Sequence, residues 1–197
     1  MRLTNRIVDL AIEYEVVDQE EKETYLVATE LLLFSALTWG TLLLMGALCG
    51  QLTGCVIFLA FHLPVRIFAG GFHQKTRIRC YAQSCFIFLL LLFGAKTVLH
   101  TWIVENWSIL ILISFLVIWL LAPVETDNKP LTKEENKKYR FITRILLVLE
   151  VAIEVFFLHS QQYDMLYYSS ISIFLAAFHL VTGVVFSNSS KDDVLAL

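Results

Sequence analysis

The 197-residue chain has few charged residues, and four long segments contain none. Asp, Glu, Lys and Arg make up 17% of the chain, against about 25% in a typical soluble domain, while 57% of the residues are hydrophobic and the mean hydropathy is +0.68. The uncharged segments are residues 31–65, 80–95, 106–124 and 165–190. Uncharged, mostly apolar runs of about 18 residues or more are candidates for membrane spans. This composition excludes a soluble enzyme, a nucleic-acid-binding domain and a disordered tail.

The cysteines lack the spacing of a metal knuckle or of a disulfide framework. There is no CxxC pair and no histidine spaced for a zinc site among Cys49, Cys55, Cys80 and Cys85. We therefore expect no metal, and one of the thiols is a candidate reactive group. The first 24 residues also lack an apolar core of signal-peptide length, so no cleaved signal is expected there.

The N-terminal segment has instead the pattern of an amphipathic helix, which we assign to residues 1–24. Apolar side chains recur at spacings of three or four residues, at Leu3, Ile7, Leu10, Tyr14 and Val17. Charged residues occupy the rest of the helical wheel. Such a helix either lies on the membrane surface or packs against another element outside the membrane, and the pattern favours neither.

Six membrane-spanning helices are expected after this segment. Their approximate ranges are 27–48, 52–68, 80–98, 105–122, 141–159 and 165–186. The second is the weakest, because it is short and contains His62 and Pro64, so it is either a full span or a re-entrant segment. The expected fold class is an all-α integral membrane protein, with one domain over residues 1–197 and a transmembrane bundle over 27–186.

Two loops between these spans are strongly basic. Residues 66–79 contain Arg66, Lys75, Arg77 and Arg79. Residues 123–140 contain Lys129, Lys133, Lys137, Lys138 and Arg140. The third and fourth spans form a hairpin between the two loops, so both lie on one side of the membrane, which the positive-inside rule makes cytoplasmic. Topology alone accounts for such charges, and they also suit an acidic segment of a substrate.

The first basic loop contains the one pair of residues typical of nucleophilic chemistry, His73 and Cys80. A thiolate is a nucleophile, and a neighbouring imidazole or cation stabilises it. Seven residues of unbroken helix rise about 10.5 Å, so the chain must turn back between the two, or His73 must meet Cys80 of a partner chain. Gly70 and Gly71 permit a tight turn just before the histidine. From spacing alone, topological charge with a buried thiol is the commoner explanation.

The residues around this pair resemble the signature of the AgrB family, the membrane peptidases of the accessory gene regulator quorum-sensing system. The matching positions are Arg66, Ala69, Gly71, His73, Cys80, Tyr81 and Ser84. The second basic loop is similar to the Ala-Pro and Lys-Pro elements of the family, at Ala122-Pro123 and Asn128-Lys129-Pro130. The chain length, the N-terminal helix and the expected spans also fit the family.

The resemblance implies a cysteine endopeptidase of the bacterial cell membrane with its active site at the cytoplasmic face. Cys80 would be the nucleophile and His73 its base, while Arg66 and Gly71 match positions that support the site. The remaining candidates for supporting or substrate-binding roles are Ser84, Gln83, Arg77, Arg79 and Lys129.

These remaining candidates have different expected roles. No third member of a catalytic triad is evident, and Gln83 is a candidate for the residue that orients His73. Ser84 lies one helical turn beyond the cysteine, where a hydrogen bond to the reacting centre and ordinary helix packing are both open, with packing the commoner. Arg77, Arg79 and Lys129 would hold an acidic substrate tail.

The implied substrate is an AgrD-like precursor peptide with an amphipathic leader, a central signal sequence and an acidic tail. Cys80 would form a thioester at the junction of signal and tail, and an internal Cys or Ser of the peptide would then close a thiolactone or lactone ring. No cofactor is expected, because the thioester retains much of the reactivity of the acyl group. Membrane lipid and a second copy of the chain, in a homodimer, are further expected partners, and nucleic acid is not.

Two carboxyl groups inside an expected span leave a different function open. Glu150 and Glu154 lie one turn apart in the fifth span, after Arg144, and either line a substrate cavity or form a structural polar pair. The alternative function is a small transporter or channel without peptidase activity, although no inverted repeat of the kind many carriers show is evident. The histidines that match no motif are expected to be structural or interfacial, namely His62, His100, His159 and His179.

Overall fold

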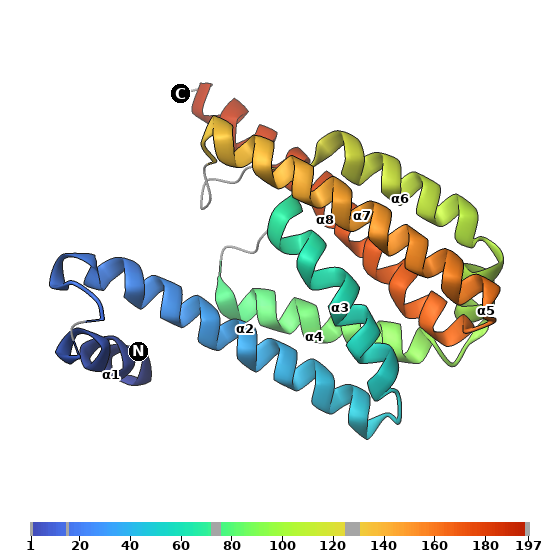
Figure 1. Ribbon diagram of the computed structural model, residues 1–197, viewed down its shortest axis with the longest axis horizontal. Helices are drawn as coiled ribbons and strands as arrows, with labels where there is room; N and C mark the ends of the chain where they lie inside the picture. Colours follow the sequence, from blue (N-terminus) through green and yellow to red (C-terminus); the bar gives the residue numbers. More distant parts are fainter. Residues whose placement is uncertain (1, 15, 72–75, 125–130, 196–197) are drawn as a thin grey trace.

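The computed structural model describes residues 2–14, 16–71, 76–124 and 131–195, and these form an all-helical protein without a β-strand (Figure 1). The helices are α1 (Arg2–Glu13), α2 (Lys22–Leu48), α3 (Leu52–Ala69), α4 (Arg77–Gly94), α5 (Val98–Glu105), α6 (Trp107–Leu121), α7 (Lys133–His159) and α8 (Tyr163–Leu195), with a 3-10 turn (Gln19–Glu21) before α2. The all-α expectation is confirmed. Long helices suit a membrane because they satisfy every backbone hydrogen bond internally.

The described residues contain four candidate spans, or five if a bent pair of helices counts as one, so the six spans that the charge-free runs predict are not confirmed. The stretch from the 3-10 turn to the end of α2, the helices α3 and α4, and the Tyr163–Val185 part of α8 are long and apolar enough to cross a membrane. The pair α5 and α6 meets the same criterion together but is bent by 71°. α7 does not meet it, because Arg144, Glu150 and Glu154 interrupt its apolar part. The weak second span is a continuous helix despite Pro64, and the broken element is the α5–α6 pair.

The helix α3 lies at the centre and packs against α8, α7 and α2 (Figure 1). One buried cluster joins α3, α6, α7 and α8 around Val65, Ile118 and Leu147, and a second joins α2, α3, α4 and α8 around Phe58 and Phe88. Glycines allow these helices to approach closely, as small residues do at membrane helix contacts.

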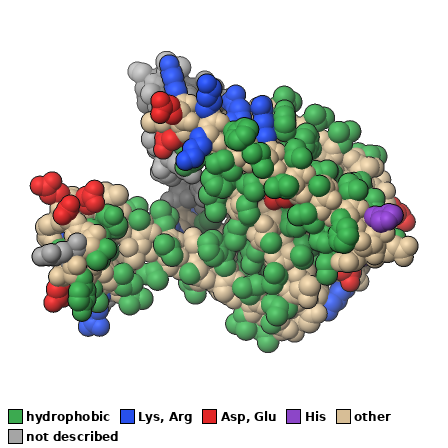
Figure 2. Space-filling model, in the orientation of Figure 1, with side chains coloured by type: hydrophobic (Ala, Val, Ile, Leu, Met, Phe, Trp, Pro, Cys, Tyr) green, Lys and Arg blue, Asp and Glu red, His purple; other side chains and the backbone are tan. Residues whose placement is uncertain are grey.

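The outer surface of the bundle is apolar, as Figure 2 shows for one face. Large hydrophobic side chains stand exposed on several helices, among them Leu32 of α2, Phe93 of α4, Leu120 of α6 and Phe156 of α7. A contiguous apolar surface of this extent marks a membrane or interaction surface in a folded protein. The multi-pass membrane character of the chain follows from this surface and the long helices.

The N-terminal helix α1 folds back against the start of α2, where Asp9 pairs with Lys22 at 2.7 Å. Its buried side chains are Thr4 and Val8, while the predicted apolar stripe remains largely exposed at Leu3, Leu10 and Tyr14. The part of the stripe up to Tyr14 is thus exposed, whereas Val17 is buried, and the helix predicted for residues 1–24 ends at Glu13. That it lies on a membrane surface stays a prediction.

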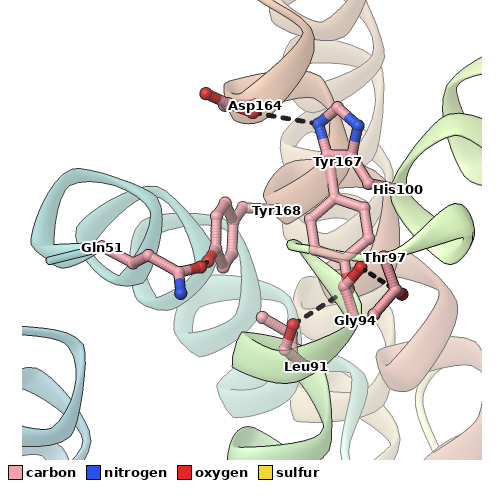
Figure 3. Close-up of polar contacts among 8 residues, drawn as sticks. All are labelled: Gln51, Leu91, Gly94, Thr97, His100, Asp164, Tyr167 and Tyr168. Atoms are coloured by element: carbon pink, nitrogen blue, oxygen red, sulfur yellow. Dashed lines mark hydrogen bonds and ion pairs between the residues drawn. The ribbon is translucent and has the colours of Figure 1, made fainter. Parts of the chain in front are cut away.

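Polar contacts close one end of the bundle (Figure 3). Tyr167 of α8 donates to the Leu91 carbonyl of α4 at 3.0 Å, and Tyr168 donates to the Gln51 amide oxygen in the α2–α3 turn. His100 of α5 contacts Asp164 of α8 at 3.0 Å. The start of α8 is thereby tied to α4, to the α2–α3 turn and to α5.

The opposite end brings the two basic loops together. The Val124 amide donates to the Ala69 carbonyl at 2.9 Å, and Gly70 and Val124 form an isolated parallel bridge. The end of α3 and the segment after α6 are thus in direct contact. The prediction that both loops lie at the same end is confirmed for the parts that the structure describes.

Candidate functional site

Cys80 lies in the first turn of α4, half-exposed. Thr76 caps this helix, since its hydroxyl accepts a hydrogen bond from the Arg79 amide at 3.4 Å and its carbonyl accepts one from the Cys80 amide at 3.1 Å. The N-terminus of a helix carries partial positive charge, a setting in which reactive thiolates are found. The local sequence thus places the candidate nucleophile at the N-terminus of a helix.

Arg66 connects the end of α3 with this cysteine. Its guanidinium is partly buried and donates to the Gly70 carbonyl at 2.6 Å, where α3 ends. Its charge also interacts electrostatically with the Cys80 side chain of α4. Two residues that are 14 positions apart in sequence therefore belong to one electrostatic environment.

The chain leaves α3 through two glycines in left-handed backbone conformations, with φ of 75° at Gly70 and 104° at Gly71. Gly71 is buried, and a Cβ placed there would lie 2.6 Å from Arg66 Nη1 and 2.8 Å from the His179 carbonyl oxygen of α8. A side chain at this position meets both backbone strain and steric overlap. The glycine that the motif requires is explained by the contact of α3, α8 and the arginine.

The other predicted site residues are distributed as follows. Ser84 is one turn beyond Cys80 and half-buried, and Gln83 is half-buried and already engaged in an interaction within the protein. His73 and Lys129 lie outside the described residues. The contact between His73 and Cys80 therefore stays a prediction.

Arg77 and Arg79, both expected to hold a substrate tail, differ in their surroundings. Arg77 forms an ion pair with Glu30 of α2, whereas Arg79 is exposed. One turn further along α4, the hydroxyls of Tyr81 and Thr41 lie 3.1 Å apart. The role of Glu30 could not be predicted from the sequence, in which it is distinguished only as the last charged residue before a long apolar run. These contacts tie the first part of α4 to α2.

If Arg77 serves to hold α4 against α2, replacing either partner of the ion pair has the same effect. We expect Arg77→Ala and Glu30→Ala to lower the melting temperature slightly and equally, and the double variant to lower it no further, because exposed pairs contribute little and partners are not additive. Thermal unfolding in detergent measures this. A role in substrate binding would instead appear as weaker peptide binding in Arg77→Ala that Glu30→Ala does not share.

A second basic surface stands at the start of α7. Thr132 and Glu135 form a capping box that fixes the first turn of this helix, and the following cations are exposed. They are Lys133, Lys137, Lys138 and Arg140. Figure 2 shows Lys and Arg side chains gathered on the upper part of the molecule, apart from the lobe formed by α1 and the start of α2. The arrangement offers anionic groups a site near the end of the bundle that contains Cys80.

Two histidines that match no motif lie next to the candidate site. The rings of His62 and His179 are 5.9 Å apart with their planes nearly perpendicular, and His62 Nδ1 lies 3.3 Å from the Ser172 carbonyl oxygen. The backbone of His179 contacts Gly71. No sequence signal indicates this proximity, because His179 lies more than 100 residues beyond His62 in the chain.

Comparison with known families extends this local agreement to most of the chain. The family model of AgrB, accessory gene regulator B, matches residues 3–181. The chain belongs to the AgrB family. The AgrB match runs from α1 into α8 and includes the whole region around Arg66, Gly71 and Cys80. No curated protein and no solved structure matches the chain.

Membership of the AgrB family makes this a membrane protein of quorum sensing that processes a propeptide. Its substrate class is accordingly an AgrD-like propeptide. The apolar helices agree with the multi-pass membrane location that the AgrB family implies.

Proposed function

We propose that this AgrB protein is a cysteine endopeptidase that removes the acidic tail of its propeptide and cyclises the remaining signal sequence. Cys80 is the nucleophile, and His73 is the general base and acid. The observation that best supports this is the position of Cys80 at the start of α4, where it interacts electrostatically with Arg66 near the end of α3. The Gly70–Gly71 turn beside this pair leads directly into the segment that contains His73.

The reaction divides into two acyl transfers. The Cys80 thiolate attacks the carbonyl carbon that joins signal to tail, the C–N bond breaks, and His73 gives its proton to the leaving amine. The acyl group is then a thioester on Cys80. A thiol or hydroxyl inside the peptide loses its proton to His73 and attacks this thioester, which releases the ring and restores the Cys80 thiolate.

The residues around the cysteine have distinct roles in this proposal. Arg66 and the N-terminus of α4 stabilise negative charge on the sulfur and on the tetrahedral intermediate. Gly71 lets the backbone pass between the arginine and α8. The exposed cations of α7, with Arg79, attract the acidic tail, which leaves after the first step. The basic loops at this end of the bundle support a cytoplasmic location of the site.

The test is co-expression of the chain with an AgrD-like precursor, with the products identified by mass spectrometry. We expect a peptide that lacks the C-terminal tail and weighs one water less than the linear signal sequence, because ring closure replaces hydrolysis. A linear product alone would show a peptidase without cyclisation. An uncut precursor, in the presence of inserted and folded protein, would contradict the proposal.

A further inference from the structure

One face of α7 carries buried polar groups that the peptidase reaction does not use. Glu154 is fully buried and Glu150 is 6% exposed, and Thr143 lies on the same face. Glu154 is five residues before the end of α7, near the closed end of the bundle and away from Cys80. The group thus forms a separate polar region in the apolar interior.

Three elements converge on the Glu154 carboxylate. Trp107, the first residue of α6, donates from Nε1 to Glu154 Oε2 at 2.9 Å, at the bend between α5 and α6. Ser169 and Ser170 of α8 also interact with this carboxylate, while the Ser169 hydroxyl donates its hydrogen bond to the Leu166 carbonyl at 3.1 Å. Both serines are fully buried, and Ser170 Oγ makes no hydrogen bond of ordinary geometry. Glu154 Oε1 and Glu150 Oε2 are likewise buried without such a bond.

No positive group of the described residues lies within ion-pair distance of either carboxylate. Arg144, on the same helix, lies over the Trp119 ring at 4.5 Å instead. α6 has no charged residue. The ionisable groups that the packed helices α3 and α8 carry make other contacts: Arg66 with Gly70, His62 with Ser172 and His179, Tyr167 with Leu91, Tyr168 with Gln51, and Asp164 with His100.

Two carboxyl groups one helical turn apart cannot both remain ionised in such a setting. An unpaired buried carboxylate costs several kcal/mol, and two neighbouring ones repel each other. A small cation between their oxygens removes both penalties. Carboxylate and hydroxyl oxygens are ligands for a proton or for a hard metal cation, and α7 and α8 supply them here.

We propose that Glu150 and Glu154, together with Ser169 and Ser170, bind one small monovalent cation inside the helix bundle. A proton and a sodium ion share the required chemistry, since each is a compact positive charge held by oxygen atoms. The site goes beyond the proposed peptidase reaction and is tested without any propeptide. Its occupancy neutralises the carboxyl pair that faces α6 and α8.

The test uses the purified full-length chain in detergent and dicyclohexylcarbodiimide, which modifies protonated carboxyl groups in apolar surroundings. We expect modification of Glu154 or Glu150, located by peptide mass mapping, that falls by about tenfold per pH unit above its midpoint. Sodium chloride is compared with potassium chloride at equal ionic strength. Protection by sodium alone assigns the site to Na⁺, and dependence on pH without protection assigns it to a proton.

Matched variants separate this site from other carboxyl groups. Glu154→Gln and Glu150→Gln keep the side-chain shape and are expected to lose most of the modification, whereas Glu105→Gln, at an exposed position near the α5–α6 bend, keeps it. Circular dichroism and gel filtration confirm folding. If a glutamine variant does not fold, the pH and sodium dependence of the unchanged chain still decides. Absence of modification, or modification indifferent to both pH and sodium, would overturn the proposal.

Discussion

Cys80→Ala is expected to abolish propeptide processing while the protein still folds and inserts into the membrane. The sulfur is the atom that forms the thioester, and loss of a catalytic nucleophile costs at least about 10³-fold in rate. Cys80 is half-exposed, so its removal leaves no large cavity. Cleavage of a co-expressed precursor, quantified by mass spectrometry and normalised to protein in the membrane fraction, measures the loss.

Cys85→Ala is the matched control for this variant. Cys85 lies five residues further along α4, is also half-buried, and has no role in the proposed reaction. The Cys85→Ala variant is expected to process the precursor at close to the rate of the unsubstituted protein. Cleavage by Cys80→Ala at more than about a tenth of the normal rate would remove Cys80 from the role of nucleophile. A transporter without peptidase activity would be indifferent to both substitutions.

Gly71→Ala is expected to reduce processing by at least about tenfold and to destabilise the protein by about 1–3 kcal/mol. The added methyl group must occupy space 2.6 Å from Arg66 Nη1, in a backbone conformation with φ of 104°. Relief of this overlap moves the guanidinium away from Cys80 or moves the chain that leads to His73. Processing assays and thermal unfolding of the purified protein measure the two effects.

Substitutions at two other glycines distinguish the effect of backbone strain from the effect of steric contact. Gly50→Ala introduces a side chain at φ of 70° with no atom within 4 Å, and Gly40→Ala introduces one in α2, also with no atom within 4 Å. We expect Gly50→Ala to lose stability but not activity, and Gly40→Ala to lose neither. If Gly71→Ala loses only as much activity as Gly50→Ala, the contact with Arg66 does not matter for the reaction.

The helices could be predicted from sequence because charge-free apolar runs leave a membrane chain few other ways to satisfy its backbone. The bend between α5 and α6 could not be predicted, since no proline or glycine marks the junction of Glu105, Asn106 and Trp107. α7 shows that charge-free apolar runs do not identify every long helix. It is one long helix, but Arg144, Glu150 and Glu154 make it too charged to count as a membrane span. Two of these residues contact α6, Arg144 over the Trp119 ring and Glu154 through the Trp107 indole.

The candidate site also has one part that the sequence predicts and another part that it does not. Arg66, Gly71 and Cys80 belong to a local motif, and Gly71 lies against the Arg66 side chain at the end of α3. The ion pair of Arg77 with Glu30 and the approach of α8 to Gly71 depend on residues distant in sequence. Residue spacing contains no information on such contacts. The approach of His73 to Cys80 remains a prediction.

The support of α4 is uneven, and this links the cysteine to the surrounding lipid. The buried residues of α4 all lie in its second half, while its first half, with Cys80, is held against α2 by Arg77 and Tyr81. α2 itself is largely exposed along its apolar length. A helix in contact with lipid tilts as the thickness of the bilayer changes. We therefore expect the position of Cys80 relative to α3 to change with the thickness of the bilayer.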